Sequence, residues 1–149
     1  MGGPKAHEEL LRELAPDLYD AGVRHLNVSL DTLKRNRYRQ ITGSDNLPAV
    51  MAGLRRAVSL GFHPLKINCV VLRGINDDEV LDIARLAREH PIQVRFIELM
   101  PTTSQTWWQR HYLSMAEVRR RLAVLGPLLV GGAAAVAAVA VVAVLAAAG

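Results

Sequence analysis

The feature that most constrains the fold is an alternation of short strand-like segments with longer helix-like segments. Residues 25–30, 65–71 and 94–99 have the apolar and β-branched composition of buried strands. Their starts are spaced so that each interval has room for one helix and its loops, as in a parallel βα unit. The sequence therefore predicts an α/β domain of about three βα units.

The helix-like segments carry end signals and apolar stripes. Residues 10–21 have a helical pattern in which Pro16 starts or kinks the last stretch. Asp45 and Asn46 are suited to cap a second helix, with Pro48 in its first turn and Gly61 after its last. The stripes expected to be buried are Val50, Met51, Leu54, Ala57 and Val58 in one helix and Val80, Ile83, Ala84 and Ala87 in the next.

Two further helix starts are indicated downstream. Asn76 and Glu79 form a variant of the capping box, and Ser114 is suited to cap a short basic helix that carries Val118 and Leu122. Both signals are local, so they predict side-chain bonds within the first turn of each helix.

Polar side chains follow one face of the first two predicted strands. Successive strand residues point to opposite faces, so Asn27 and Ser29 share a face of the first strand, and Lys66 and Asn68 share a face of the second. In a βα barrel or half-barrel this face is the lumen, and ligands bind at the carboxyl ends of its strands. We therefore expect a ligand face here.

Lys66 needs a partner, because a buried and unpaired ammonium group costs free energy. Two interpretations are open: a structural ion pair with Glu98, or a contact to a phosphate or nucleobase. In the third strand the periodicity does not decide whether Arg95 or Glu98 faces inward, since each face carries one charge.

The cysteine content limits the chemistry. The chain of 149 residues has one cysteine, Cys69, so it provides neither a disulfide framework nor a cysteine-based metal site. Cys69 falls on the apolar face of its strand and is expected to be a packed hydrophobic residue. A reducing, cytosolic setting follows. The excess of 18 Lys and Arg over 14 Asp and Glu is mild and suits anionic small ligands as well as nucleic acid.

An apolar tail follows the predicted domain. Residues 128–148 carry no charge and are mostly Ala and Val, and Arg119, Arg120 and Arg121 precede them. By length this tail, expected to be helix-like, can cross a bilayer. The favoured alternative is a low-complexity stretch, because alanine contributes little to membrane insertion.

Several strings in order carry a resemblance to a known family. They are Asn-Val-Ser-Leu-Asp at 27–31, Arg-Gln-Ile-Thr-Gly at 39–43, Lys-Ile-Asn-Cys-Val-Val at 66–71, Arg-Gly-Ile-Asn-Asp-Asp-Glu at 73–79 and Arg-Phe-Ile-Glu-Leu-Met-Pro at 95–101. This ordered set resembles the molybdenum cofactor biosynthesis protein A family, which are radical S-adenosylmethionine enzymes acting as GTP 3′,8-cyclases. It covers roughly residues 10–127.

The resemblance implies a partial TIM-like βα barrel and a role in molybdenum cofactor biosynthesis. It implies S-adenosylmethionine contacts at Ser29 and Met100, a GTP contact at Lys66, and S-adenosylmethionine and a [4Fe-4S] cluster as cofactors. It also implies homodimers in the cytoplasm and no nucleic-acid partner. Both cysteine motifs of the family are absent here, so we expect this chain to bind no cluster and to be inactive alone.

This comparison divides the chain into an unrelated extension at 1–9, the partial barrel at 10–127 and the apolar tail at 128–149. Two other hypotheses remain. The chain is a non-catalytic barrel scaffold or membrane-tethered binding module, or it belongs to another radical S-adenosylmethionine enzyme with related strands.

Overall fold

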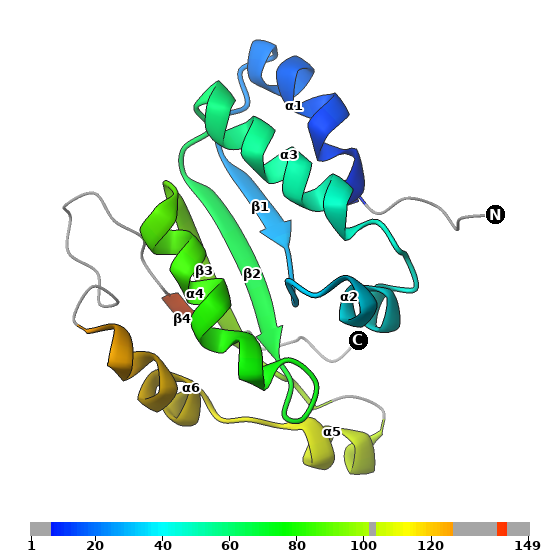
Figure 1. The fold of residues 1–149 in the computed structure, drawn as a ribbon, viewed down its shortest axis with the longest axis vertical. Coiled ribbons are helices and arrows are strands. Elements are labelled where there is room, and N and C mark those ends of the chain that lie inside the picture. Colours follow the sequence, from blue (N-terminus) through cyan, green and yellow to red (C-terminus); the bar gives the residue numbers. More distant parts are fainter. Residues whose placement is uncertain (1–6, 102–103, 127–139, 143–149) are drawn as a thin grey trace.

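The computed structural model describes residues 7–101, 104–126 and 140–142. Its strands form one parallel sheet in the order β1-β2-β3-β4, so neighbours in the sequence are neighbours in the sheet (Figure 1). They are β1 (Leu26–Ser29), β2 (Leu65–Val71), β3 (Ile92–Glu98) and β4 (Ala140–Val142). The three predicted strands are thus confirmed, and β3 begins two residues earlier than predicted.

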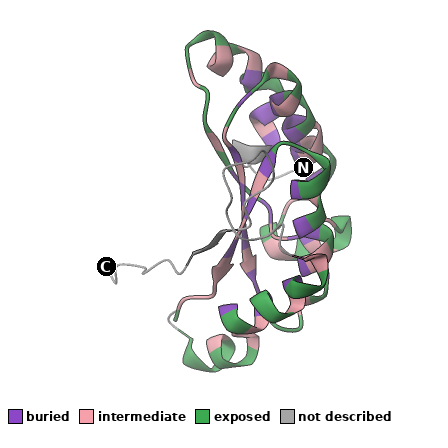
Figure 2. Cartoon of the chain, turned by 90° about the vertical axis from the view of Figure 1, so that its left-hand side faces the viewer, coloured by how far each residue is buried: buried purple, intermediate pink, exposed green. Residues whose placement is uncertain are grey.

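The described helices cover one side of this sheet, and none of them lies on the other side, which we call the open side (Figure 2). Parallel neighbours require crossover connections, and α3 lies in the one between β1 and β2 and α4 in the one between β2 and β3. The helical elements are η1 (His7–Leu10), α1 (Leu11–Asp20), α2 (Arg35–Thr42), α3 (Leu47–Leu60), η2 (Asp77–Glu79), α4 (Val80–Glu89), α5 (Gln105–His111), α6 (Met115–Leu122) and η3 (Ala123–Leu125).

The hydrophobic core lies between the sheet and the helices. Alternate residues of β2 and β3 face this core and are at most 3% exposed: Leu65, Ile67, Cys69, Val71, Ile92, Val94 and Phe96. The register pairs Asn68 with Arg95, so Arg95 lies on the open face. Phe96 packs against the helices, so its face of β3 points toward the core and the face with Arg95 points to the open side. The sequence alone does not decide between these two orientations.

The predicted helix signals are confirmed in part. Helix α3 has Pro48 in its first turn and ends at Gly61, whose φ of 89° favours glycine. The predicted cap of α3 is wrong: Asn46 makes no side-chain cap bond, and Asp45 instead forms an ion pair with Arg35 at 2.8 Å. Helix α1 continues through Pro16.

The buried face predicted for α4 is confirmed in full, and that of α3 is buried except for half-buried Met51 and Val58. Ser114 caps α6 as predicted, because its hydroxyl accepts a hydrogen bond from the Glu117 N–H at 3.2 Å.

The described part of the tail differs from the helix-like prediction. Residues Ala140–Val142 form β4, which pairs in parallel with β3 through Arg95–Ala140 and the two following pairs. Valine favours strands, and an edge strand offers unpaired backbone groups to any segment that reaches it. The rest of the tail, residues 128–139 and 143–149, lies outside the described residues. None of the described helices is long and apolar enough to cross a membrane.

Candidate functional site

Polar side chains line the open face of the sheet in two rows. The strand register places Ser29, Asn68 and Arg95 side by side in one row. Asn27, Lys66 and Gln93 form the row before it, toward the amino ends of the strands. The first row lies near the carboxyl ends, where parallel α/β sheets bind ligands. The structure thus brings Ser29 and Lys66 onto one face, as the sequence predicts.

Two cations on this face lack carboxylate partners. Lys66 and Arg95 are half-buried, and neither makes an ion pair within the part of the chain that the structure describes. A half-buried and unpaired cation is costly unless water or an anion compensates it. The pair of cations therefore makes this face suitable for an anionic ligand.

The interpretation of Lys66 as the ion-pair partner of Glu98 is wrong. Lys66 pairs in register with Gln93, whereas Glu98 pairs with Val71, which places their side chains on opposite faces of the sheet. Glu98 accepts a hydrogen bond from the Met115 N–H at 2.9 Å, at the start of α6. This carboxylate stabilises a helix end, so it does not compensate Lys66.

Asn68 lies between Ser29 and Arg95 and carries a polar atom without a partner. Its Oδ1 is buried and accepts no hydrogen bond from the described residues. A buried acceptor without a hydrogen bond destabilises the fold, and a donor on a ligand can offset this cost by forming the missing bond. The row thus contains an amide oxygen whose hydrogen-bonding capacity the described residues do not use.

Met100 lies apart from the two rows. It is half-buried and follows the end of β3 by two residues, and β2 separates its strand from Ser29 in β1. The segment before it is held by Trp108, whose indole N–H donates to the Leu99 carbonyl at 2.9 Å. The register thus places Ser29 and Met100 at the same edge of the sheet but does not make them neighbours.

The loops at the carboxyl edge are joined by side chains from the motif strings. The Asp31 carboxylate accepts a bond from the Val70 N–H at 2.9 Å. The Asn76 amide donates to the Asp31 and Val70 carbonyls at 2.8 Å each, and its oxygen accepts from the Leu72 N–H at 2.7 Å. The loop after β1 is therefore tied to the loop after β2, which fixes the row that contains Ser29.

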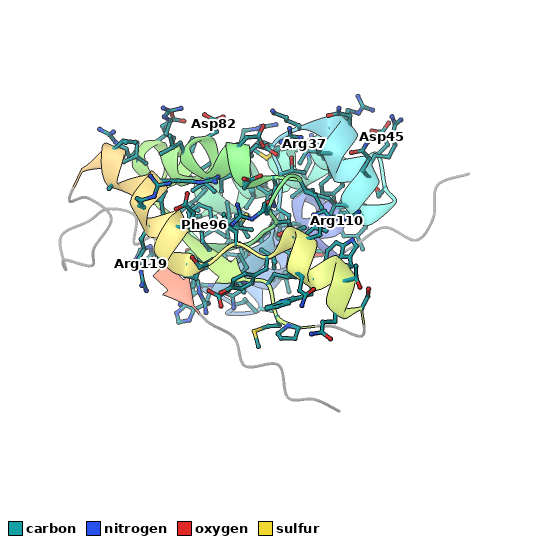
Figure 3. The ribbon with its side chains drawn as sticks, turned by 90° about the horizontal axis from the view of Figure 1, so that it is seen from below. Arg37, Asp45, Asp82, Phe96, Arg110 and Arg119 are labelled. Atoms are coloured by element: carbon teal, nitrogen blue, oxygen red, sulfur yellow. The ribbon has the colours of Figure 1, made fainter. Side chains whose placement is uncertain are left out.

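Glu79 is the centre of a second connection between these loops. It is 1% exposed and accepts bonds from the Thr32 hydroxyl at 2.7 Å and the Leu33 N–H at 2.9 Å. Arg37 from α2 pairs with it at 3.0 Å (Figure 3 shows Arg37 at this edge). The capping-box interpretation of Asn76 and Glu79 is therefore wrong, because both side chains bond across the sheet edge.

Arg37 also pairs with the exposed Asp78, whose other partner is Lys34. The hydrogen bond from Arg37 lowers the pKa of the Asp78 carboxyl to about 2 and raises the pKa of the guanidinium, which therefore stays charged. We call Thr32, Arg37, Asp78 and Glu79 the edge cluster. Sequence reasoning missed it, because its partners lie more than 40 residues apart.

Cys69 is buried in the core, as predicted, and burial raises the pKa of its thiol. A protonated thiol inside the core is a poor metal ligand. The described residues contain no group of three or more His, Cys, Asp or Glu side chains placed to hold a metal ion. An iron–sulfur cluster needs several thiolates, so the single cysteine of this sequence does not fit one.

Comparison with known proteins gives consistent results. A family described as the radical SAM superfamily matches residues 5–87. The GTP 3',8-cyclase of Moorella thermoacetica is 47% identical over 118 residues, which cover 79% of this chain and 36% of that protein. The enzyme of the same name from Pelotomaculum thermopropionicum is 46% identical over 122 residues, covering 80% and 38%.

A solved structure shares the fold. A radical SAM methyltransferase from Sphaerobacter thermophilus superposes with a TM-score of 0.58 at 20% identity, over 80% of this chain and 33% of that one. The chain spans little more than a third of the length of the cyclases that it matches.

Proposed function

Because the chain belongs to the radical SAM superfamily, we propose that it is the ligand-presenting segment of a GTP 3′,8-cyclase of molybdenum cofactor biosynthesis. The observation that carries the proposal is the open sheet face, where Lys66 and Arg95 lack ion pairs among the described residues. Both proposed ligands, GTP and S-adenosylmethionine, carry anionic groups.

The architecture supports an incomplete βα barrel as the finer fold. Parallel strands follow one another in sequence order, and the crossover helices lie on a single side. A doubly wound sheet instead has helices on both sides. The open face is then the lumen of the barrel.

Within this face each residue has a separate task. Lys66 binds the GTP phosphates or base as a point charge. Ser29, in the adjacent strand β1, donates or accepts a hydrogen bond to S-adenosylmethionine through its hydroxyl. Asn68 and Arg95 extend the Ser29 row with an amide and a guanidinium, which suits a carboxylate. Met100 adds an apolar thioether at the end of β3.

S-adenosylmethionine supplies the reactive group of this enzyme class, and the residues of this chain bind and orient it. A [4Fe-4S] cluster does not fit the one buried thiol. We therefore propose that the chain alone is inactive. The division at residues 9 and 127, the homodimer and the cytoplasmic location stay predictions.

Equilibrium titration of the full chain with GTP and with S-adenosylmethionine tests the ligand assignment. Lys66→Gln should weaken GTP binding about tenfold and leave S-adenosylmethionine binding unchanged. Ser29→Ala should weaken S-adenosylmethionine binding, by less than about tenfold, and leave GTP binding unchanged. Arg119→Gln, at an exposed position of α6, is the matched control. Equal effects of all three variants would contradict the assignment.

Anaerobic reconstitution with iron and sulfide tests the inactivity. We expect background iron and no product from GTP. Stoichiometric iron in the purified chain, with cleavage of S-adenosylmethionine, would overturn this part of the proposal.

A further inference from the structure

A second surface lies on the outer side of the helices, away from the ligand face. Helices α1 and α3 approach closely at Gly53, where a Cβ atom would lie 2.8 Å from Leu11 Cβ and 3.0 Å from the Arg12 backbone nitrogen. Only glycine permits this spacing without a shift of one helix. The close approach brings Arg12 of α1 beside Arg55 and Arg56 of α3.

These three arginines surround a surface hollow of about 380 Å³ that Ala52 and Ser59 complete. None of the three guanidinium groups makes an ion pair within the described ranges. Several other arginines do, namely Arg35, Arg37, Arg85, Arg120 and Arg121. Three like charges around one hollow repel each other, so the hollow favours an anionic occupant.

An apolar groove of about 320 Å³ adjoins the hollow, between α3 and α4, and shares Arg55 and Ser59 with it. Its other lining residues are Met51, Leu54, Val58, Leu86, His90 and Ile92. Ile92 is the first residue of β3, so the groove lies at the amino ends of the strands. An occupant there leaves the carboxyl-end ligand face free.

We propose that the hollow and the groove together bind an acidic segment of a partner protein. Its carboxylates pair with Arg12, Arg55 and Arg56, and an apolar side chain enters the groove. Charge complementarity favours the acidic segment, and the adjoining groove favours protein over nucleic acid. The phosphates of a nucleic acid would pair with the arginines but leave the apolar groove exposed to water. This inference does not depend on the chemistry proposed for the open face.

Selection of random linear peptides displayed against the full chain tests this proposal. The enriched peptides should combine acidic residues with a large apolar residue, and added salt should weaken them. Arg12→Glu with Arg56→Glu should weaken binding of the enriched peptide about tenfold or more, and Met51→Glu should also weaken it. Arg88→Glu, an exposed arginine outside the hollow, should not.

The substituted arginines are exposed, whereas Met51 is half-buried. Circular dichroism of each variant verifies that its fold is intact. Failure to enrich peptides, or enrichment of peptides whose binding survives Arg12→Glu and Arg56→Glu, would overturn the proposal. A single-stranded RNA that binds with the same arginine dependence, but is insensitive to Met51→Glu, would identify the surface as a nucleic-acid site instead.

Discussion

The two faces of the sheet are built from alternate residues of the same strands and differ in burial and in charge. On the helix side, Ile67 and Phe96 are fully buried in a continuous apolar core. On the open side, their neighbours Lys66 and Arg95 are half-buried cations without ion pairs among the described residues. The helix side stabilises the fold through apolar burial. The open side carries charged groups that the described part of the fold does not pair and that can therefore bind a ligand.

The carboxyl edge joins the two faces. Its loops are held by hydrogen bonds of the buried side chains of Asn76 and Glu79. Ser29 therefore lies on a strand whose end is fixed, although its own side chain is exposed. A binding site requires a backbone held in place and side chains that are free to bond to a ligand.

Phe96→Ala and Arg95→Ala compare the two faces most strongly. Phe96→Ala should lower the free energy of unfolding by about 4 kcal/mol, because it leaves a cavity in the core. Arg95→Ala, one residue away on the open face, should change it by less than about 0.5 kcal/mol. Urea denaturation of both variants measures this difference. Similar losses for the two variants would show that the open face also carries folding energy.

Glu79→Ala probes the edge cluster and should have the next largest effect. We expect a loss of about 3 kcal/mol, because Thr32 and the Leu33 N–H lose their buried acceptor and Arg37 loses a partner. Asp78→Ala is the matched control, and its exposed ion pair should be worth less than about 1 kcal/mol. If the two losses are alike in denaturation experiments, Glu79 is not the centre of the cluster.

Gly53→Ala tests the close packing of α1 on α3. The added Cβ overlaps Leu11, and this overpacking outweighs the better helix propensity of alanine, so a net loss of about 1 kcal/mol is expected. Ser59→Ala, at an exposed position of the same helix, should be neutral or slightly stabilising. A gain in thermal stability from Gly53→Ala would mean that the helices lie further apart.

Acid titration should have the smallest effect. The hydrogen bond from Arg120, followed by that from Arg121, lowers the pKa of Glu117 from 4.5 to about 2. Because the pKa is lower in the folded state, the stabilisation is present above about pH 4.5 and is lost as the pH falls toward about 2. Glu117→Gln should therefore flatten the pH dependence of unfolding in this window. An unchanged slope would show that these exposed ion pairs contribute nothing.

The sequence predicts those parts of the fold that depend on local periodicity. The alternation in β2 and the apolar stripe of α4 correspond to the burial in the structure, because each pattern is read within one element. Ser29 and Lys66 are placed on a common face for the same reason.

The errors arise where tertiary partners compete with local signals. Glu79 has the position of a capping-box residue but bonds to Thr32, 47 residues away, where burial strengthens its hydrogen bonds. The Lys66–Glu98 ion pair is one of two interpretations that the charges of the sequence allow, and the register of β3 excludes it by placing the two residues on opposite faces. No local pattern predicts that residues 140–142 pair with β3 as a further strand of the sheet.

Lysine footprinting tests the central claim most directly, namely that the open face is the ligand face. The sequence contains three lysines, Lys5, Lys34 and Lys66, so acetylation of each can be followed separately by mass spectrometry. With saturating GTP, acetylation of Lys66 should fall several-fold while that of Lys34 in the exposed Asp78 ion pair stays constant. Acetylation of Lys66 at the same rate with and without bound GTP would contradict the account.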